Sequence, residues 1–333
     1  MRICIFGAGA VGSHFAVRLA LAGHDVSCVM RGPHLEAVKA NGLTLRVGAA
    51  EFSARVDASD DPAALGPQDF VISTLKATGL SSLATGLPPL LRDDTAIVFA
   101  QNGIPWWYDL GLPPDHPPAP NLSFLDPGGL LRAAIPKERI IGGVIFSANE
   151  LAAPGIVVNN STDRNMLLVG ECDDRATGQI ERLRAALDQA LIQSPPEPRI
   201  REVIWTKLIG NMSISVLCLL TGQTVKAAVQ EPALRDVVPR LLEEAQAVAR
   251  SCYPEVKRDT RGGAPADHKP SLLQDYELGR AMEIDALVRA PAAFARAAGL
   301  STPMLDVIAG LAIRQARDKG LYQSTASTTA SGR

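Results

Sequence analysis

Lys207 and Asn211 stand four residues apart in the apolar segment WTKLIGN, and this spacing places both side chains on one face of a predicted helix. A lysine ammonium can give a proton to a developing alkoxide, and an asparagine amide can orient that lysine or hydrogen-bond a substrate. In such a helix, however, a lysine usually extends to solvent and an asparagine usually makes a structural hydrogen bond. The pair therefore indicates acid catalysis only if other groups join it.

The N-terminal segment GAGAVG has the spacing G-x-G-x-x-G, directly after a predicted strand and at the start of a predicted helix. Gly7 permits a tight turn, Gly9 lets a pyrophosphate approach the backbone, and Gly12 lets helix and strand pack closely. The helix N-terminus offers N–H groups and the positive end of a dipole to phosphates. We therefore predict a dinucleotide site rather than a merely glycine-rich turn. Its residues are Gly7, Ala8, Gly9, Ala10, Val11 and Gly12.

Arg31 stands 19 residues after Gly12, where a site selective for NAD would carry Asp or Glu for the ribose hydroxyls. A cation at this point suits a 2′-phosphate. We therefore predict that NADPH/NADP+ is preferred over NADH, against the alternative of a solvated arginine at a strand end.

The glycine segment needs a strand, a helix and a second strand around it, and the pattern predicts these at Arg2–Phe6, Ser13–Ala22 and Asp25–Met30. Such an alternation is typical of a doubly wound α/β sheet. The further strands that we expect lie at 43–47, 69–75, 95–100, 139–150, 155–160 and 165–170, with a helix near 176–190.

Lys76 and Asn102 each follow one of these strands, at 69–75 and 95–100. Ligands bind at the carboxyl ends of strands in open α/β sheets, so Lys76 can contact the cofactor, with a surface lysine as the alternative. Asn102 lies in QNG, which is also a good turn sequence. We favour a cofactor or substrate contact for Asn102, because two strands then place polar residues at one edge.

The proline-rich segment QSPPEPR at 193–199 is the best linker, because prolines resist both helix and sheet, and helical periodicity follows it. The predicted fold class is therefore α/β, an N-terminal Rossmann doubly wound sheet followed by an all-α C-terminal domain. We expect an NADP-binding domain at 1–196, a helical substrate and catalytic domain at 197–320, and a disordered tail at 321–333. A second proline-rich stretch, 105–136, is either an excursion near a site or a surface insertion, and we favour the insertion.

Composition excludes several functions. The 333 residues carry a formal net charge of −2, so nucleic acid and anionic membranes lose their usual electrostatic attraction. The cysteines and histidines lack ligand spacing, and we expect no metal site, no disulfide framework and a cytoplasmic protein. Glycines interrupt the apolar N-terminus, which argues against a signal peptide, and the apolar run at 208–220 is too short to span a bilayer.

Two polar residues stand out in the helical half. Ser271 and Gln274 have the spacing of a capping box after Pro270, so a structural role competes with a hydroxyl that holds a carboxylate. Glu283 is expected in the same helix, and an ion pair with Arg280 or Arg289 is as well supported as a function.

The order of the motifs GAGAVG with Arg31 behind it, TLKA, QNG, WTKLIGN and SLLQD…EID is similar to that of the ketopantoate reductase (2-dehydropantoate 2-reductase) family, over roughly residues 1–315. The resemblance implies an NADPH-dependent reductase of a small 2-keto acid, with a Rossmann domain, a helical domain and the active site between them. It implies catalytic roles for Lys207 and Glu283. Supporting roles fall to Asn102, Lys76, Asn211 and Ser271.

Ser215, Met282 and Arg289 depart from the family's pattern and leave the substrate open. Ketopantoate, reduced to (R)-pantoate, is the leading substrate, and another 2-keto or 2-hydroxy acid is the alternative. A non-catalytic NADP(H)-binding sensor is the alternative of another class, but it has no need of Lys207 and Glu283. Apolar faces on several C-terminal helices would allow a homodimer.

Overall fold

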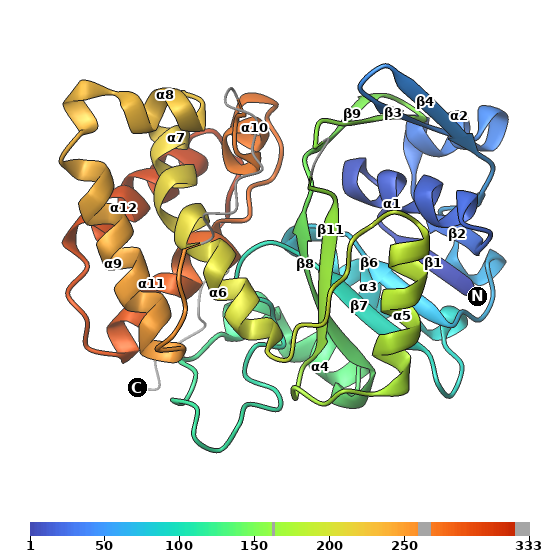
Figure 1. The fold of residues 1–333 in the computed structure, drawn as a ribbon, viewed down its shortest axis with the longest axis horizontal. Coiled ribbons are helices and arrows are strands. Elements are labelled where there is room, and N and C mark those ends of the chain that lie inside the picture. Colours follow the sequence, from blue (N-terminus) through green and yellow to red (C-terminus); the bar gives the residue numbers. More distant parts are fainter. Residues whose placement is uncertain (162–163, 259–267, 324–333) are drawn as a thin grey trace, which may run out of the picture.

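The computed structural model describes residues 1–161, 164–258 and 268–323, in which a sheet-containing part adjoins a helical part (Figure 1). Most of the tail expected at 321–333 lies outside the described residues.

A seven-stranded sheet forms the centre of the first part, in the order β11-β8-β7-β6-β1-β2-β5. Its strands are β1 (Arg2–Phe6), β2 (Asp25–Val29), β5 (Asp57–Ser59), β6 (Phe70–Ser73), β7 (Ala96–Ala100), β8 (Ile140–Phe146) and β11 (Met166–Glu171). Neighbours run parallel, except β11, which pairs antiparallel with β8. All residues of β6, β7 and β8 are buried, as expected for strands covered on both faces.

A second, four-stranded sheet has the order β4-β3-β10-β9. Its strands are β3 (Leu43–Val47), β4 (Ala50–Ala54), β9 (Asn149–Ala153) and β10 (Ile156–Asn159). The strand expected at 43–47 therefore lies outside the central sheet, and the one expected at 139–150 divides into β8 and β9. Pairing between β3 and β10 joins segments about a hundred residues apart, which no local pattern reveals.

In the described residues before Ile200, five α-helices accompany these sheets: α1 (Ala10–Leu21), α2 (Gly32–Asn41), α3 (Leu80–Gly86), α4 (Leu130–Ala134) and α5 (Gly178–Gln189). The alternation along β1 divides the core, because Ile3 and Ile5 pack with α1 and α5 on one face, while Cys4 and Phe6 pack with α3 on the other. Helix α1 begins at Ala10, three residues earlier than predicted, so Gly12 lies inside its first turn.

The described residues from Ile200 onward form helices only, and the predicted fold class is confirmed. The helices are α6 (Ile200–Gly210), α7 (Val216–Thr221), α8 (Val225–Gln230), α9 (Val237–Cys252), α10 (Ser271–Glu277), α11 (Ala290–Ala297), α12 (Pro303–Asp318), and the π-helical turns η7 (Asn211–Ser215) and η9 (Asp285–Arg289). Because η7 joins α6 to α7, Ile200–Thr221 is one apolar helix of 22 residues, long enough to cross a membrane by length and composition. The expectation of too short a run is therefore wrong, but 67% of the helix's apolar window is buried inside the protein.

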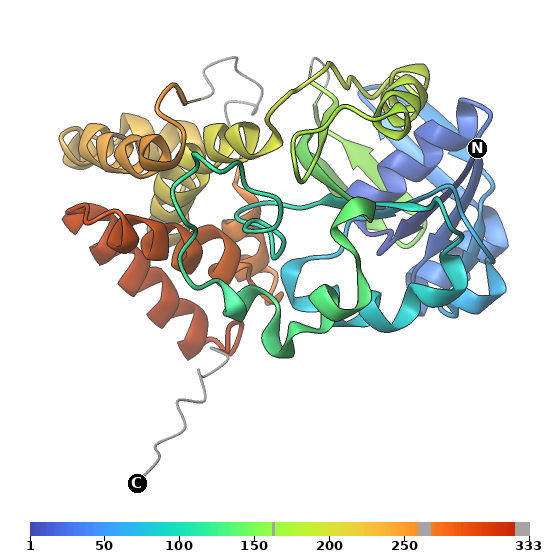
Figure 2. The same ribbon diagram turned by 90° about the horizontal axis from the view of Figure 1, so that it is seen from below.

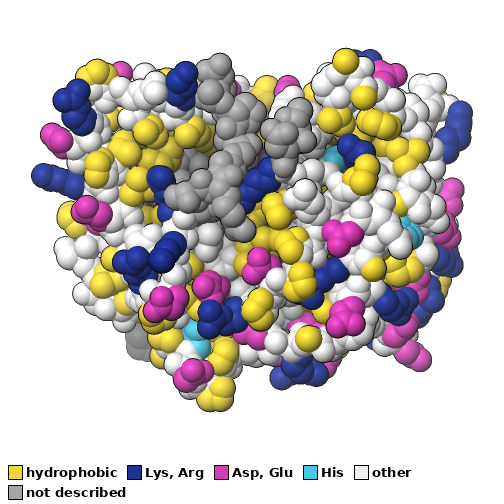
Figure 3. All heavy atoms as spheres, in the orientation of Figure 1, with side chains coloured by type: hydrophobic (Ala, Val, Ile, Leu, Met, Phe, Trp, Pro, Cys, Tyr) yellow, Lys and Arg dark blue, Asp and Glu magenta, His cyan; other side chains and the backbone are white. Residues whose placement is uncertain are grey.

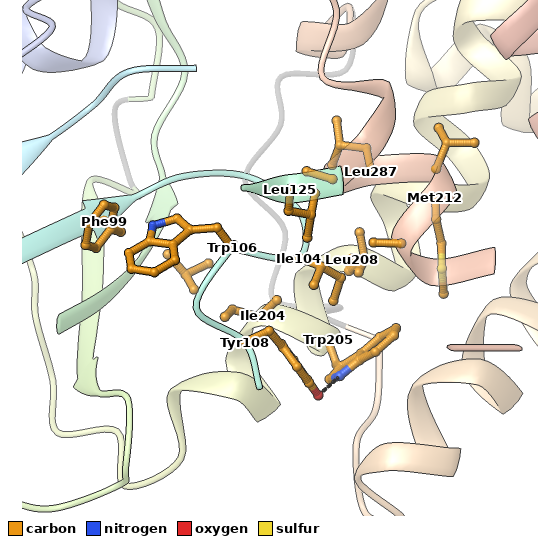
Figure 4. Packing of buried hydrophobic residues seen from close by; sticks show 14 of the residues in the cluster. Phe99, Ile104, Trp106, Tyr108, Leu125, Ile204, Trp205, Leu208, Met212 and Leu287 are labelled. Atoms are coloured by element: carbon orange, nitrogen blue, oxygen red, sulfur yellow. Dashed lines mark hydrogen bonds between the residues drawn. The ribbon is translucent and has the colours of Figure 1, made fainter. Parts of the chain in front are cut away.

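The segment after β7 joins the two parts. Trp106, Trp107 and Tyr108 are at most 1% exposed, and they belong to one buried cluster with Phe99 of β7 and Trp205 of α6 (Figure 4). Figure 2 shows this segment running between the sheet and the helices. The start of the proline-rich stretch is thus core rather than the surface insertion that we favoured.

Candidate active site

The glycine loop lies against the carboxyl end of β2. Gly7 and Ala8 donate their N–H groups to the carbonyl oxygen of Val29 at 2.9 and 3.2 Å. Gly7 has a φ of +91°, and a Cβ at this position would lie 2.5 Å from Leu75 Cδ2. Only glycine fits this turn on both counts.

Gly9 and Gly12 differ in the space around them. A Cβ on Gly12 would lie 2.5 Å from Thr74 Oγ1 and 2.8 Å from Ile5 Cγ2, so Gly12 lets α1 pack onto the sheet. A Cβ on Gly9 would meet nothing nearer than Gly7 O at 3.9 Å. The first helical hydrogen bond runs from Ser13 N to Gly9 O, which leaves the earlier N–H groups at the helix start outside the ladder. Open space beside these donors fits the phosphates of a dinucleotide.

Arg31 extends the same edge of the sheet. It follows β2 after Met30, and its exposed side chain stands at the N-cap of α2. The acidic residue of this strand, Asp25, lies at the opposite end of β2, with its carboxylate 3.5 Å from Arg2 Nε. The carboxyl end of β2 is therefore followed by a cationic residue, Arg31.

Lys207 comes to this edge from the helical part. Helix α6 packs against β8 and β11, and Lys207 Nζ donates to Asn102 Oδ1 at 2.6 Å and to the carbonyl oxygen of Ile145 at 2.5 Å. Asn102 follows β7 and Ile145 lies in β8, so two neighbouring strands hold the ammonium. The aromatic ring of Phe146 lies 5.3 Å from the same nitrogen. Lys207 is thus partly buried and oriented, not extended into solvent.

Glu283 lies in the loop before η9, not within α10 as predicted, because α10 ends at Glu277. Its side chain is buried, and Oε1 accepts the backbone N–H of Ala77 at 3.1 Å. The suggested ion pair with Arg289 is wrong, since Arg289 Nη1 pairs with Asp285 Oδ1 at 2.6 Å. Burial raises the pKa of Glu283 above its ordinary value. Asp275 adds to the increase, and the N–H of Ala77, Lys76 and Lys207 oppose it.

Lys76 forms a further contact between the two parts. Its Nζ lies 2.5 Å from Oδ1 of Asp275, whose side chain is only 7% exposed. Sequence reasoning missed Asp275 as a site residue, although the quoted motif SLLQD ends on it. What identifies Asp275 is the contact of its buried carboxylate with Lys76. The sequence does not show this contact, because it forms only when the chain folds.

Ser271 lies one helical turn from Asp275, and Asn211 lies one helical turn from Lys207. Ser271 precedes Asp275 by four residues on α10, and its side chain is exposed. The predicted capping box is wrong, because Pro270 is the N-cap and Gln274 Nε2 donates instead to Lys269 O at 2.8 Å. Asn211 follows Lys207 by four residues, and its Oδ1 accepts a long hydrogen bond of 3.5 Å from Ser215.

A glycine loop at the edge of a parallel sheet, beside a partly buried lysine and amide and a buried carboxylate, defines a NAD(P)-dependent oxidoreductase of the Rossmann type. Two family models match the chain: "Ketopantoate reductase PanE/ApbA" over residues 3–107, and "Ketopantoate reductase PanE/ApbA C terminal" over residues 199–315. The chain belongs to the ketopantoate reductase family, as its motifs indicated, and it is an oxidoreductase acting on C=O and CH–OH groups.

Individual relatives agree with this. The chain is 40% identical to 2-dehydropantoate 2-reductase of Mesorhizobium japonicum, over 97% of this chain and 100% of that protein. It is 28% identical to the solved 2-dehydropantoate 2-reductase of Geobacter metallireducens, with a TM-score of 0.78 over 94% and 99% of the two chains. D-mandelate dehydrogenase, solved with NADH and anilino(oxo)acetate, shares the fold at 20% identity, with a TM-score of 0.78 over 97% and 100% of the chains.

Proposed function

We propose that the protein reduces 2-dehydropantoate to (R)-pantoate with NADPH, residues 1–196 binding the cofactor and residues 197–320 supplying groups that act on the substrate. The observation that carries the proposal is the ammonium of Lys207, held by Asn102 and Ile145 at the ligand-binding edge of the sheet. The name of the 40% identical relative supports the choice of substrate.

The residues at the sheet edge fit the cofactor. The open space at Gly9 and the N–H groups that begin α1 suit the pyrophosphate, and Arg31 suits a 2′-phosphate. Lys76 and Asn102, at the ends of β6 and β7, would complete the contacts. When bound, NADPH supplies the hydride that reduces the keto carbon.

The chain's own groups handle the charge that this reduction creates. Negative charge develops on the former carbonyl oxygen, and the Lys207 ammonium stabilises and protonates it. Asn102 and Ile145 direct that ammonium. Glu283, buried and raised in pKa, hydrogen-bonds a hydroxyl of the substrate or product. Asn211 and Ser271 are the further substrate contacts of the proposal.

The test is oxidation of NADPH in the presence of 2-dehydropantoate. We expect Lys207→Ala to lower kcat by about a hundredfold or more, the usual contribution of a positioned general acid, with the Kd for NADPH nearly unchanged. Lys226→Ala is the matched control, because Lys226 is an exposed lysine of α8. Retention of kcat within a few-fold in Lys207→Ala would refute the role of the lysine.

A different 2-keto acid is the second candidate substrate. The fold alone does not select ketopantoate, since D-mandelate dehydrogenase shares it. The departures from the family's pattern also lie near the proposed substrate contacts: Ser215 contacts Asn211, and Met282 precedes Glu283. A panel of 2-keto acids assayed by kcat/KM decides between the substrates. Tight NADPH binding without turnover of any of them would instead favour the non-catalytic sensor.

A further inference from the structure

The segment from Asn102 to Leu110, which follows β7, contacts both α6, which carries Lys207, and η9, which begins two residues after Glu283. Asn102 accepts the hydrogen bond from Lys207 of α6. Two residues later, Ile104 N donates to the carbonyl oxygen of Ala286 at 3.0 Å. Ala286 follows Glu283 by three residues. Gly103, between Asn102 and Ile104, has a φ of +81°, and a Cβ there would lie 2.6 Å from the same Ala286 oxygen. The segment is therefore pressed against η9 and cannot shift freely.

Further along, the segment is fastened to α6 by Tyr108, Arg201 and Trp205, which we call the aromatic clamp. Trp205 Nε1 donates to the hydroxyl of Tyr108 at 2.7 Å, and Figure 4 shows the two rings meeting at this bond. Arg201 donates from Nε to Tyr108 O at 2.8 Å and from Nη2 to Leu110 O at 2.5 Å. The ring of Phe294 packs edge-on against both aromatic rings, with centroids 5.0 and 5.1 Å away.

The clamp has little freedom to slide. All three of its side chains are 0% exposed, and Arg201 also lies over the rings of Trp107 and Tyr108. The two carbonyl oxygens compensate the Arg201 guanidinium for the water that it loses on burial, so lengthening either hydrogen bond costs free energy. A buried indole N–H and phenol hydroxyl are likewise costly to separate.

We propose that the aromatic clamp sets the distance between Lys207 and Asn102, so that Tyr108, Arg201 and Trp205 are positioning residues for proton transfer. Tyr108 follows Asn102 by six positions on one side, and Lys207 follows Trp205 by two on the other, so a shift at the clamp reaches the ammonium through short, packed spans. A misplacement of about 1 Å can cost a hundredfold in rate. The inference rests on the proposed function, in which Lys207 is the acid.

The test compares Tyr108→Phe, Trp205→Phe and the double variant, which remove the same hydrogen bond. We expect kcat to fall about tenfold in each single variant and by no more in the double variant, because the effects of one shared bond are not additive. The Kd for NADPH stays within twofold, and the solvent deuterium isotope effect on kcat rises, because proton transfer limits the rate more. The matched control is Tyr253→Phe, which removes a buried hydroxyl that has no hydrogen-bond partner among the described residues.

Two kinetic outcomes would overturn the proposal: a kcat within twofold of the wild type in Tyr108→Phe, measured well below its unfolding temperature, or an equal loss in Tyr253→Phe. If the wild type reduces no 2-keto acid, the proposed function fails instead. Crystal structures of the wild type and the double variant then decide on the clamp. Displacement of Lys207 Nζ from Asn102 Oδ1 supports it, and an unchanged contact overturns it.

Discussion

His14, two residues after the glycine motif, is a buried residue that makes the stability of the fold depend on pH. Its side chain is 0% exposed, and neither ring nitrogen has a hydrogen-bond partner among the described residues. Burial lowers the pKa of His14 from 6.5 to about 3, and the charge of Arg18 adds to the effect. The folded protein therefore keeps this imidazole neutral at pH values where the unfolded chain protonates it.

This shift predicts a loss of stability in acid. Because the folded pKa is depressed, the contribution is complete above pH 6.5 and is lost as the pH falls towards 3. The free energy of unfolding should decrease by about 1.4 kcal/mol per pH unit from this group alone. Urea unfolding of the wild type and His14→Leu between these limits measures it. Parallel pH dependences in the two proteins would contradict the assignment.

The predicted preference for NADPH over NADH depends on Arg31. We expect Arg31→Ala to lower kcat/KM for NADPH about tenfold, because one charge-assisted contact to the 2′-phosphate is lost, and to leave the value for NADH nearly unchanged. Steady-state kinetics with both cofactors measure the ratio. Equal efficiency of the wild type with NADPH and NADH, or an unchanged ratio in the variant, would count against a phosphate contact.

At the scale of elements, two glycines at the start of α1 have different predicted roles. Gly12 allows α1 to pack on the sheet, and Gly9 leaves space for the phosphates of the cofactor. Gly12→Ala places a methyl group 2.5 Å from Thr74 Oγ1, so we expect overpacking to lower the free energy of unfolding by about 1–3 kcal/mol. Gly9→Ala meets open space, so its stability should stay within about 0.5 kcal/mol of the wild type. Its Kd for NADPH should nevertheless rise at least tenfold, because the methyl group occupies space left for phosphate.

Denaturant unfolding and fluorescence titration with NADPH measure the two effects on the same proteins. Each variant serves as the control for the other. Normal NADPH affinity in Gly9→Ala would show that the phosphates do not pass over this residue.

Local patterns predicted the elements around the glycine loop better than those that shape the rest of the proposed site. The first strand was predicted to the residue, because an apolar run meets a glycine with positive φ at its end. Glu283 was placed in the wrong element, since the helical periodicity continues past Glu277 although the chain turns at Gly279, which also has positive φ. The contacts of Asp275 and Tyr108 join residues far apart in sequence, which no local pattern reports.

At the scale of the whole molecule, the two proposed domains share their core. One buried cluster extends from Phe99 of the sheet through Trp106 and Trp205 to Ala316 of α12. Charges of both signs are interspersed on the face shown in Figure 3, in keeping with the net charge of −2. Val307 and Leu311 of α12 are 60% and 54% exposed, and the homodimer stays a prediction.

The shared core predicts that a fragment of residues 1–196 does not behave as an independent domain. Removing α6 uncovers Trp106, Trp107 and Tyr108, an apolar patch that favours association. We expect the fragment to self-associate and to lack a cooperative unfolding transition. Size-exclusion chromatography and thermal unfolding measure this, with the full chain as control. A monomeric fragment with a sharp transition would show that the boundary near residue 196 divides two autonomous units.

The positions of the tryptophans have an optical consequence. The chain has three, Trp106, Trp107 and Trp205, all at most 1% exposed and all at the junction between sheet and helices. Tryptophan fluorescence therefore originates from this junction, and the burial of the three indole rings shifts the emission to short wavelength. A reduced nicotinamide bound at the nearby sheet edge absorbs in that range and would quench the emission by energy transfer. Quenching of the tryptophan emission would therefore report binding of the reduced cofactor without an added label.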